Sequence, residues 1–327
     1  MAISPVAVNS VPYSLAGKRV WVAGHRGMVG NAIMRRLESE QCEILTVDHA
    51  ELDLKRQEHV ESWIADARPD AIFMAAATVG GIHANETRPA EFLYDNLMIE
   101  SHVIETAYRI GVEKLMFLGS ACIYPREAPQ PMAEDALLTG PLEPTNEWYA
   151  IAKIAGIKLC QAYRHQYGCD FISAMPTNLY GAGDNFDLTS SHVVPALIAK
   201  ACRARLNGDP SMEIWGSGRP RRELLYVDDA ADALVHLMTN YSDAPHVNIG
   251  TGKDVTIREL AEIICRAVGF EGRLAFDASK PDGTPRKLLD VSALAAAGWR
   301  ASIGLEEGLR LTYAWYRDAI ECGEVRT

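Results

Sequence analysis

Tyr149 and Lys153 lie four residues apart, so on a helix their side chains share one face, one turn from each other. A phenol titrates at about pH 10 and exchanges protons poorly at neutral pH unless a neighbour stabilises its anion. A lysine ammonium can do so, and it can also hold the ribose of a nicotinamide. This pair indicates proton transfer to an oxygen atom during hydride transfer.

Ser120 offers a third polar group for the same chemistry. It ends an expected strand, residues 114–120, and precedes Tyr149 by 29 residues. Its hydroxyl can donate a hydrogen bond to a carbonyl under reduction. Tyr/Lys pairs at this spacing are common on surface helices by chance. The conjunction with Ser120 and with a glycine loop upstream predicts a catalytic triad of Ser120, Tyr149 and Lys153.

The glycine loop at residues 24–30 follows an apolar strand and opens a helix. Its spacing is G-x-x-G-x-x-G. Glycines so placed allow a tight turn, close approach of backbone amides to a pyrophosphate, and close packing of helix on strand. A turn-forming loop without a ligand is the alternative. We predict a dinucleotide in contact with Gly24, Arg26, Gly27, Met28, Val29 and Gly30.

Two residues favour different dinucleotides. Asp48 ends the second expected strand, where a carboxylate accepts hydrogen bonds from the adenosine ribose and repels a 2′-phosphate. Arg26, inside the loop, can instead pair with a 2′-phosphate. Asp53 and Leu54 are expected near the adenine, although Asp53 is also suited to capping a helix.

Strands and helices alternate along most of the chain. Strands are expected at residues 18–23, 43–47, 71–76, 114–120, 170–175 and 246–249, and helices at 31–40, 60–67, 91–110 and 228–239. This order predicts an α/β fold, a Rossmann-type doubly wound parallel sheet with a smaller C-terminal α/β substrate domain. We assign 17–184 plus about 224–250 to the first domain, and about 185–223 plus 251–327 to the second.

The composition excludes several classes of protein. The net charge of −11 argues against nucleic acid as the main partner, because phosphate backbones require clustered Lys and Arg. No apolar run approaches the roughly 18–20 residues of a membrane span. The seven cysteines show no zinc spacing and fit reduced thiols, so we expect a cytoplasmic protein without a metal. Residues 1–16 make a poor signal peptide.

Nine stretches, spread from near residue 18 to beyond residue 290, carry a resemblance to known enzymes. They are G-H-R-G-M-V-G (24–30), A-A-A-T-V-G-G-I (75–82), F-L-G-S-A-C-I-Y-P (117–125), E-P-T-N-E-W-Y-A-I-A-K-I-A-G (143–156), M-P-T-N-L-Y-G (175–181), D-N-F (184–186), S-H-V-V-P-A-L (191–197), W-G-S-G (215–218) and D-A-S-K-P-D-G-T-P-R-K-L-L-D (277–290). On these the chain resembles the extended short-chain dehydrogenase/reductases of nucleotide sugars, in particular the bifunctional 3,5-epimerase/4-reductases of GDP-sugars.

The resemblance implies roles for Cys122 and His192. From the residues alone, a buried thiol is usually an apolar filler and a lone histidine a structural residue. In the family, the matching pair acts as base and acid beside a ketone. The implied reaction epimerises GDP-4-keto-6-deoxy-D-mannose at carbons 3 and 5, then reduces the 4-keto group with NADPH. Both carbons flank the ketone, so one acid/base pair can serve both.

Other family positions imply ligand contacts. Pro176, Asn178 and Leu179 match residues near the nicotinamide. The matching residues that hold the GDP part of the substrate are Lys200, Trp215, Arg222 and Asp282. Taken alone, Lys200 is equally well a solvated cation, and Trp215 a core aromatic.

Two departures from the family pattern bear on these expectations. Residue 121 is Ala where a second small hydroxyl residue is usual, and Asp48-His49 stands where the family often has a basic residue near the ribose. The resemblance favours NADP(H), and Asp48 leaves NAD(H) possible. The helix at 91–110 and the Tyr149 helix are amphipathic, and in this fold such helices often pair, so we expect a homodimer.

Of four other functions, the first three fit these residues less well. A 4,6-dehydratase needs an acidic residue beside the triad serine, where this chain has Ala121 and Cys122. A 4-epimerase has no use for a Cys/His pair. A non-catalytic dinucleotide sensor would have lost Tyr149 or Lys153. A related enzyme for another GDP-keto-deoxysugar fits all of these residues.

Overall fold

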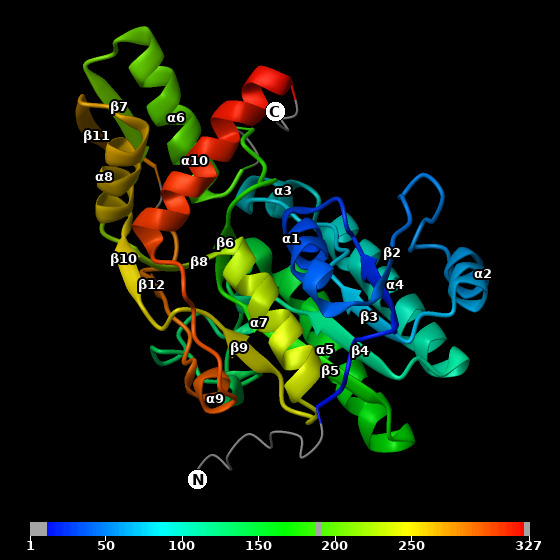
Figure 1. Ribbon diagram of the computed structural model, residues 1–327. Helices are drawn as coiled ribbons and strands as arrows, with labels where there is room; N and C mark the ends of the chain where they lie inside the picture. Colours follow the sequence, from blue (N-terminus) through cyan, green and yellow to red (C-terminus); the bar gives the residue numbers. More distant parts are fainter. Residues whose placement is uncertain (1–11, 188–190, 281, 324–327) are drawn as a thin grey trace.

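A six-stranded parallel sheet forms the centre of the computed structural model, which describes residues 12–187, 191–280 and 282–323 (Figure 1). The strands, in spatial order, are β2 (Glu43–Leu45), β1 (Arg19–Ala23), β3 (Ala71–Met74), β4 (Lys114–Leu118), β5 (Asp170–Pro176) and β9 (Val247–Ile249). After β1 the chain turns to β2 on one side and then to β3 on the other. The carboxyl ends of β1 and β3 therefore flank a topological switch point, where open α/β sheets bind ligands.

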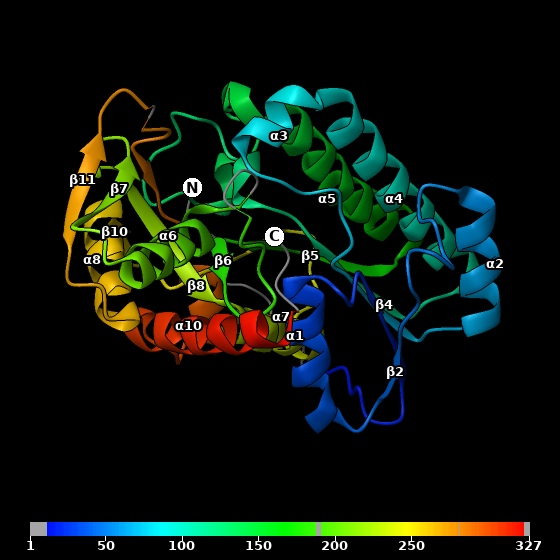
Figure 2. The ribbon, with the colours of Figure 1, turned by 90° about the horizontal axis from the view of Figure 1, so that it is seen from above.

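Helices cover both faces of this sheet (Figures 1 and 2). One face carries α1 (Met28–Leu37) and α7 (Val227–Asn240), and the other α2 (Gln57–Ala67), α4 (Pro89–Ile110) and α5 (Glu147–Tyr167). Val20 and Val22 of β1 pack toward the first pair, whereas Trp21 packs toward the second group. Burial on both faces explains the continuous apolar runs of the strands. The predicted doubly wound sheet is confirmed.

A second group of elements has a hydrophobic core of its own, seen at the left of Figure 1. Its strands are β6 (Asn178–Tyr180), β8 (Arg221–Tyr226), β10 (Asp254–Thr256) and β12 (Arg286–Lys287) in one sheet, and β7 (Ser211–Trp215) with β11 (Arg273–Asp277) in another. Its helices are α6 (Val193–Asn207), α8 (Ile257–Val268) and α10 (Leu305–Cys322). The short helices α3 (Ile82–Thr87) and α9 (Ser292–Ala296) lie outside this core. The domain boundaries given above stay a prediction.

Several elements begin or end at residues other than those expected. Helix α1 begins at Met28 rather than residue 31, because Gly27 has the extended backbone of an N-cap and Gly30 packs inside the first turn. Strands β2 and β4 end at Leu45 and Leu118, so Asp48 and Ser120 follow their strands instead of ending them. The expectation that these two residues end strands is therefore wrong, although both remain on the carboxyl side of the sheet.

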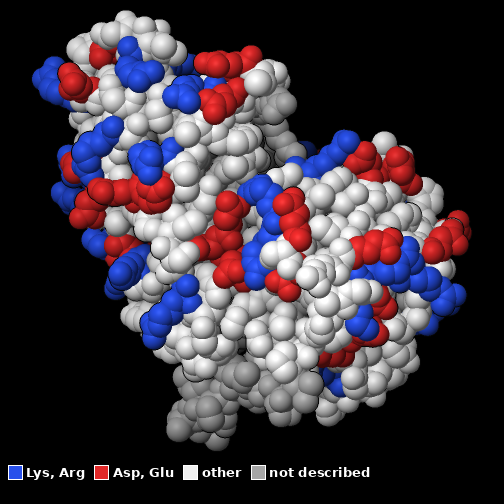
Figure 3. Space-filling model, viewed as in Figure 1, with Lys and Arg blue, Asp and Glu red and all other residues white. Residues whose placement is uncertain are grey.

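The surface carries charges of both signs. On the face seen in Figure 3, Lys and Arg side chains are interspersed with Asp and Glu rather than gathered into one basic area. Among the described residues, no helix is long and apolar enough to cross a bilayer.

Glu223, a fully buried residue of β8, joins several chain segments. Its carboxylate accepts hydrogen bonds from the backbone N–H groups of Thr251 and Gly252, both at 2.7 Å, and of Leu289 at 2.8 Å. Its backbone carbonyl accepts one from the Asn178 side chain at 3.0 Å. Burial raises the pKa of Glu223, and these donors oppose that shift by stabilising the anion.

Replacing Glu223 should destabilise the fold. Glu223→Gln keeps the shape but turns one acceptor into a donor, so at least one buried N–H group loses its partner. We expect a loss of about 2 kcal/mol in the free energy of unfolding, measured by denaturant titration. Glu271→Gln, on an exposed loop, is the matched control and should change little. Equal stability of the two variants would contradict this role.

Candidate active site

The predicted triad comes together where α5 packs against the end of β4. Tyr149 and Lys153 occupy the first turns of α5, and Ser120 lies two residues after the end of β4. The Lys153 ammonium is buried, donates a hydrogen bond to the Leu118 carbonyl at 3.1 Å, and lies 5.8 Å from the centre of the Tyr149 ring. The Ser120 hydroxyl interacts with the Tyr149 phenol and lowers its pKa. The structure therefore assembles the three residues as expected.

The Tyr149 phenol holds its proton in this environment. Burial, with smaller contributions from the negative charges of Cys122 and Glu100, raises its pKa well above the ordinary value. The phenol is thus protonated at neutral pH. A protonated phenol beside a serine hydroxyl can donate to the alkoxide that forms when a ketone accepts a hydride.

Cys122 lies two residues after Ser120, on the short 3-10 helix η2 (Ala121–Ile123), which packs against α5. Burial raises the pKa of its thiol, while Ser120 and the charges of Lys287 and Lys153 lower it. On balance the pKa of the thiol is raised, so Cys122 holds its proton at neutral pH, and the two ammonium groups lower the cost of forming the thiolate that a proton-abstracting cysteine requires.

His192 stands at the N-cap of α6, with part of its side chain open to solvent. Desolvation by the surrounding protein and the nearby Lys287 ammonium lower its pKa. A less basic imidazole gives up its proton more readily once protonated. Lys287 therefore acts on both members of the predicted acid/base pair.

Lys287 is a site residue that sequence reasoning missed. It lies on β12, more than 160 residues from Cys122, and its own pKa is lowered by burial. With Cys122, Arg126, Glu143 and Thr284 it lines a small cavity beside the triad. Its stretch was part of the resemblance, but only the fold shows that this lysine faces Cys122.

The glycine loop packs closely on its own backbone and on the segment that follows β3. Gly24 has a φ of 85°, and a Cβ there would lie 2.7 Å from the Ala76 nitrogen. A Cβ on Gly30 would lie 2.2 Å from the Gly24 carbonyl oxygen, which only glycine permits. Gly27, Met28 and Val29 form the start of α1 between these close approaches, with backbone N–H groups suited to a pyrophosphate.

Asp48 forms an ion pair with Arg26 at 2.7 Å and lies 3.3 Å from His25. The two residues that favoured different dinucleotides are therefore in direct contact. The Asp53 carboxylate accepts a hydrogen bond from the Lys55 nitrogen in a turn before α2, so it is not the N-cap of that helix. The Leu54 carbonyl lies 3.1 Å from the His102 ring.

The residues expected at the nicotinamide lie beyond β4. Pro176 ends β5, and Asn178 and Leu179 lie on β6, next to β8. Asn178 has an exposed side chain that donates to the Glu223 carbonyl at 3.0 Å.

The four residues expected to hold GDP lie in the second group of elements. The Trp215 ring is 56% exposed, with the ammonium of Lys200 at 4.7 Å and that of Lys280 at 5.5 Å from its centre. Asp282 accepts hydrogen bonds from the Ser217 nitrogen at 2.6 Å and hydroxyl at 2.7 Å. An open aromatic face between cations suits a base and a phosphate.

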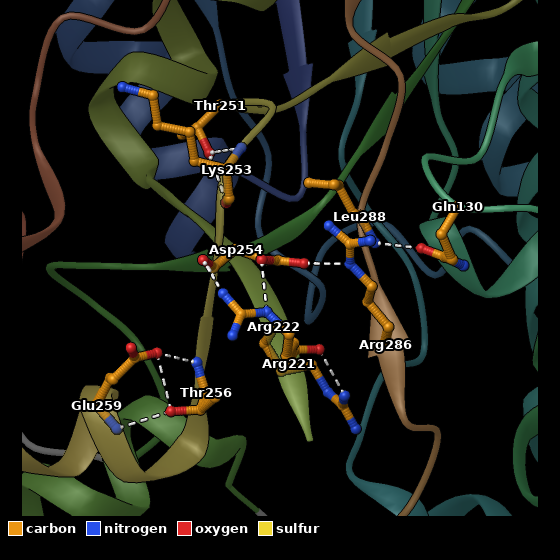
Figure 4. A network of polar contacts seen from close by, with 10 residues as sticks. All are labelled: Gln130, Arg221, Arg222, Thr251, Lys253, Asp254, Thr256, Glu259, Arg286 and Leu288. Atoms are coloured by element: carbon orange, nitrogen blue, oxygen red, sulfur yellow. Dashed lines mark hydrogen bonds and ion pairs between the residues drawn. The ribbon is translucent and has the colours of Figure 1, made fainter. Parts of the chain in front are cut away.

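Arg222 lies on a strand that is fixed from both sides. Figure 4 shows Asp254 of β10 paired with Arg221 of β8 and Arg286 of β12. Arg222 donates to the carbonyl of Arg221 at 2.8 Å, and the Asp282 charge acts on its guanidinium. This network holds the strand next to Lys287 in register, so Arg222 and Lys287 are presented from neighbouring strands.

The model of the NAD dependent epimerase/dehydratase family matches residues 20–250, well over half of the chain. The chain belongs to this family. It is 62% identical to GDP-L-fucose synthase of Sinorhizobium fredii over 92% of this chain and 96% of that protein. It is 58% identical to GDP-L-fucose synthase 1 of Arabidopsis thaliana, over 91% and 93%. A solved structure of a GDP-L-fucose synthetase from Naegleria fowleri bound to NADP has a TM-score of 0.90 at 27% identity, covering 98% of this chain and 100% of that one.

Membership of the family confirms the resemblance and the fold class, and it makes the protein an NAD(P)-dependent enzyme. No comparison tests the individual site residues, which stay predictions supported by the geometry above.

The Asp48–Arg26 pair should set the choice of dinucleotide. Asp48→Asn removes both the repulsion of a 2′-phosphate and the ion pair that competes for Arg26. We expect the ratio of kcat/KM for NADPH over NADH to rise about tenfold. Asp53→Asn, in the neighbouring turn, should leave the ratio unchanged. An unchanged ratio in Asp48→Asn would show that these side chains do not discriminate.

Proposed function

We propose that the enzyme converts GDP-4-keto-6-deoxy-D-mannose to GDP-L-fucose, by epimerisation at carbons 3 and 5 and then NADPH-dependent reduction of the 4-keto group. The observation that carries this proposal is the packing of η2, which carries Cys122 and follows Ser120, against α5, which carries Tyr149 and Lys153. A proton-abstracting thiol and a proton-donating phenol thereby share one carbonyl site. The high identity to enzymes named GDP-L-fucose synthase supports the substrate.

Epimerisation uses Cys122 and His192. The Cys122 thiolate removes the proton from carbon 5 or carbon 3, and the electron pair of that C–H bond moves into an enolate on oxygen 4. Ser120 and Tyr149 donate hydrogen bonds to this oxygen. Protonated His192 then delivers a proton to the opposite face of the carbon, which inverts the centre. Two such cycles, with the acid and base restored between them, invert both carbons.

Reduction uses the triad. NADPH, when bound along the glycine loop, supplies the hydride for carbon 4. Tyr149 donates its proton to oxygen 4, Ser120 keeps that oxygen in place, and Lys153 stabilises the phenolate that results. The Arg26 guanidinium is suited to the 2′-phosphate, and the NADP-bound relative supports the same choice.

Lys200, Trp215, Arg222 and Asp282 are proposed to hold the GDP. The cations neutralise the diphosphate, and the exposed Trp215 ring offers a stacking surface.

Separate steps predict separable variants. Tyr149→Phe should abolish NADPH oxidation, a loss of at least about 10²-fold. It should still exchange solvent deuterium into the keto sugar, because Cys122 and His192 remain. Cys122→Ala should lose the exchange as well as the formation of GDP-L-fucose. NMR of the keto sugar in deuterated water distinguishes the two variants by whether deuterium enters the sugar.

Two outcomes would contradict this division of labour. Exchange that survives in Cys122→Ala would remove the thiol from the epimerisation. Unchanged turnover in both Cys122→Ala and His192→Asn would instead favour a 4-epimerase, which has no need of this pair.

We also propose a cytoplasmic homodimer that forms through α4 and α5. Tyr94, Trp148, Ile151 and Tyr167 leave large apolar side chains exposed on these two helices. Exposed apolar groups on two adjacent helices suit burial against a second copy. All seven cysteines are free thiols, which fits a reducing compartment.

Charges on this surface should separate the subunits. Tyr94→Lys with Ile151→Lys is expected to give the mass of one 35.9 kDa chain, against twice that for the parent protein, by light scattering after gel filtration. Leu206→Lys, at an exposed residue of α6, should leave the mass unchanged. A single-chain mass for the parent protein would overturn the dimer.

A further inference from the structure

Glu100 is a charged residue of α4 that lies in the interior of the protein. Its side chain is 2% exposed, and neither carboxyl oxygen has a hydrogen-bond partner among the described residues. A carboxylate buried without compensation is strongly unfavourable. A leucine or methionine would fill the same space between α4 and α5 without this disadvantage, so the carboxylate requires a reason.

The surroundings of Glu100 lead directly to the catalytic lysine. A Cβ placed on Gly156 of α5 would lie 2.8 Å from the Glu100 Oε2 and 2.3 Å from the tip of the Phe117 ring. The Lys153 ammonium lies 4.7 Å from the centre of that same ring. The glycine therefore lets the Glu100 carboxylate approach α5 within one turn of Lys153.

Lys153 is a buried cation whose ammonium has no carboxylate hydrogen-bond partner among the described residues. It is 3% exposed, and within the described residues its ammonium donates a hydrogen bond to an uncharged group, the carbonyl of Leu118. Glu100 is the carboxylate whose charge acts on Lys153.

Among the described residues, Lys153 is the cation whose charge acts on Glu100. On α5, the Glu100 charge raises the pKa of Tyr149 and of Cys160. The charge of Cys122, on η2, raises the pKa of Lys153 and of Tyr149. β4 contributes the Phe117 ring. Burial raises the pKa of Glu100, and the Lys153 charge lowers it by stabilising the carboxylate. Burial lowers the pKa of Lys153, and the Glu100 charge opposes that shift.

We propose that Glu100 is a positioning residue for the reduction step: its carboxylate is the buried counter-charge that keeps Lys153 protonated and in place beside Tyr149. This inference depends on the proposed function, in which Lys153 works with Tyr149. It adds a fourth side chain, on a different helix, that acts through the lysine without touching the substrate.

Burial and the Glu100 charge shift the pKa of Lys153 in opposite directions. Without the Glu100 charge, burial lowers the pKa of Lys153 unopposed. The ammonium then loses its proton at a lower pH, and the stabilisation of the Tyr149 phenolate is lost with it. The basic limb of the reduction rate against pH should therefore move toward lower pH.

Glu100→Gln tests this with little change of shape. We expect the basic limb of kcat for NADPH oxidation to move down by about one pH unit, with a smaller change in the KM for the GDP-sugar. Glu100→Asp, which keeps the charge, should recover most of the shift. Glu105→Gln is the matched control, because Glu105 lies on the same helix but contacts Tyr163. A basic limb that stays in place in Glu100→Gln would overturn the proposal.

A second measurement does not need turnover. The melting temperatures of Glu100→Gln, Lys153→Met and the double variant form a cycle. Each single variant leaves one buried charge without its partner, so the double variant should melt higher than the sum of the two losses predicts. Strictly additive losses would contradict the pairing. If the parent protein oxidises no NADPH with the keto sugar, the proposed function fails, whereas this cycle still decides whether Glu100 and Lys153 pair.

Discussion

The hydrogen bond from the Lys153 ammonium to the Leu118 carbonyl joins the two elements on which the site depends. Leu118 ends β4, so this bond fixes α5 against the strand whose continuation carries Ser120 and Cys122. The phenol, the serine hydroxyl and the thiol are thereby brought to one place, although Tyr149 is far from Ser120 in sequence. The buried ammonium needs the β4 carbonyl, and in our proposal it also needs the Glu100 carboxylate from α4.

The remaining elements bring charge to this place. Glu223 fixes the segments around Thr251 and Leu289 against β8, and the Asp254 network fixes β10 and β12 to the same strand. Lys287, held on β12, then faces Cys122 and His192 and acts on the pKa of both. A site that moves protons at two carbons requires such a fixed cation, because a mobile one would be solvated and its effect screened.

Local sequence patterns were enough to predict the central sheet, the glycine loop and the triad. Short apolar runs bounded by turn residues mark buried strands, and the i, i+4 spacing of Tyr149 and Lys153 is a property of one helix. The start of α1 was placed too late because Gly30 was assigned to the loop, whereas its lack of a Cβ serves the packing of the helix itself.

Long-range features could not be predicted in this way. In the sequence Lys287 is indistinguishable from an ordinary surface cation. Only the pairing of β12 with β8 places it near Cys122. In the sequence Glu100 looks like any polar residue of an amphipathic helix. Its burial depends on how closely α5 approaches α4 at Gly156. Strand β6 was missed because three residues carry too little periodicity, and its partner β8 lies 40 residues away in the chain.

In the proposed mechanism, one carbonyl site performs both the proton transfers and the reduction. The most direct test is the isotope pattern of the product made by the unmodified enzyme in deuterated water with ordinary NADPH, read by NMR. We expect GDP-L-fucose with deuterium at carbons 3 and 5 and ordinary hydrogen at carbon 4. A reduced product that retains ordinary hydrogen at carbons 3 and 5 would contradict this mechanism.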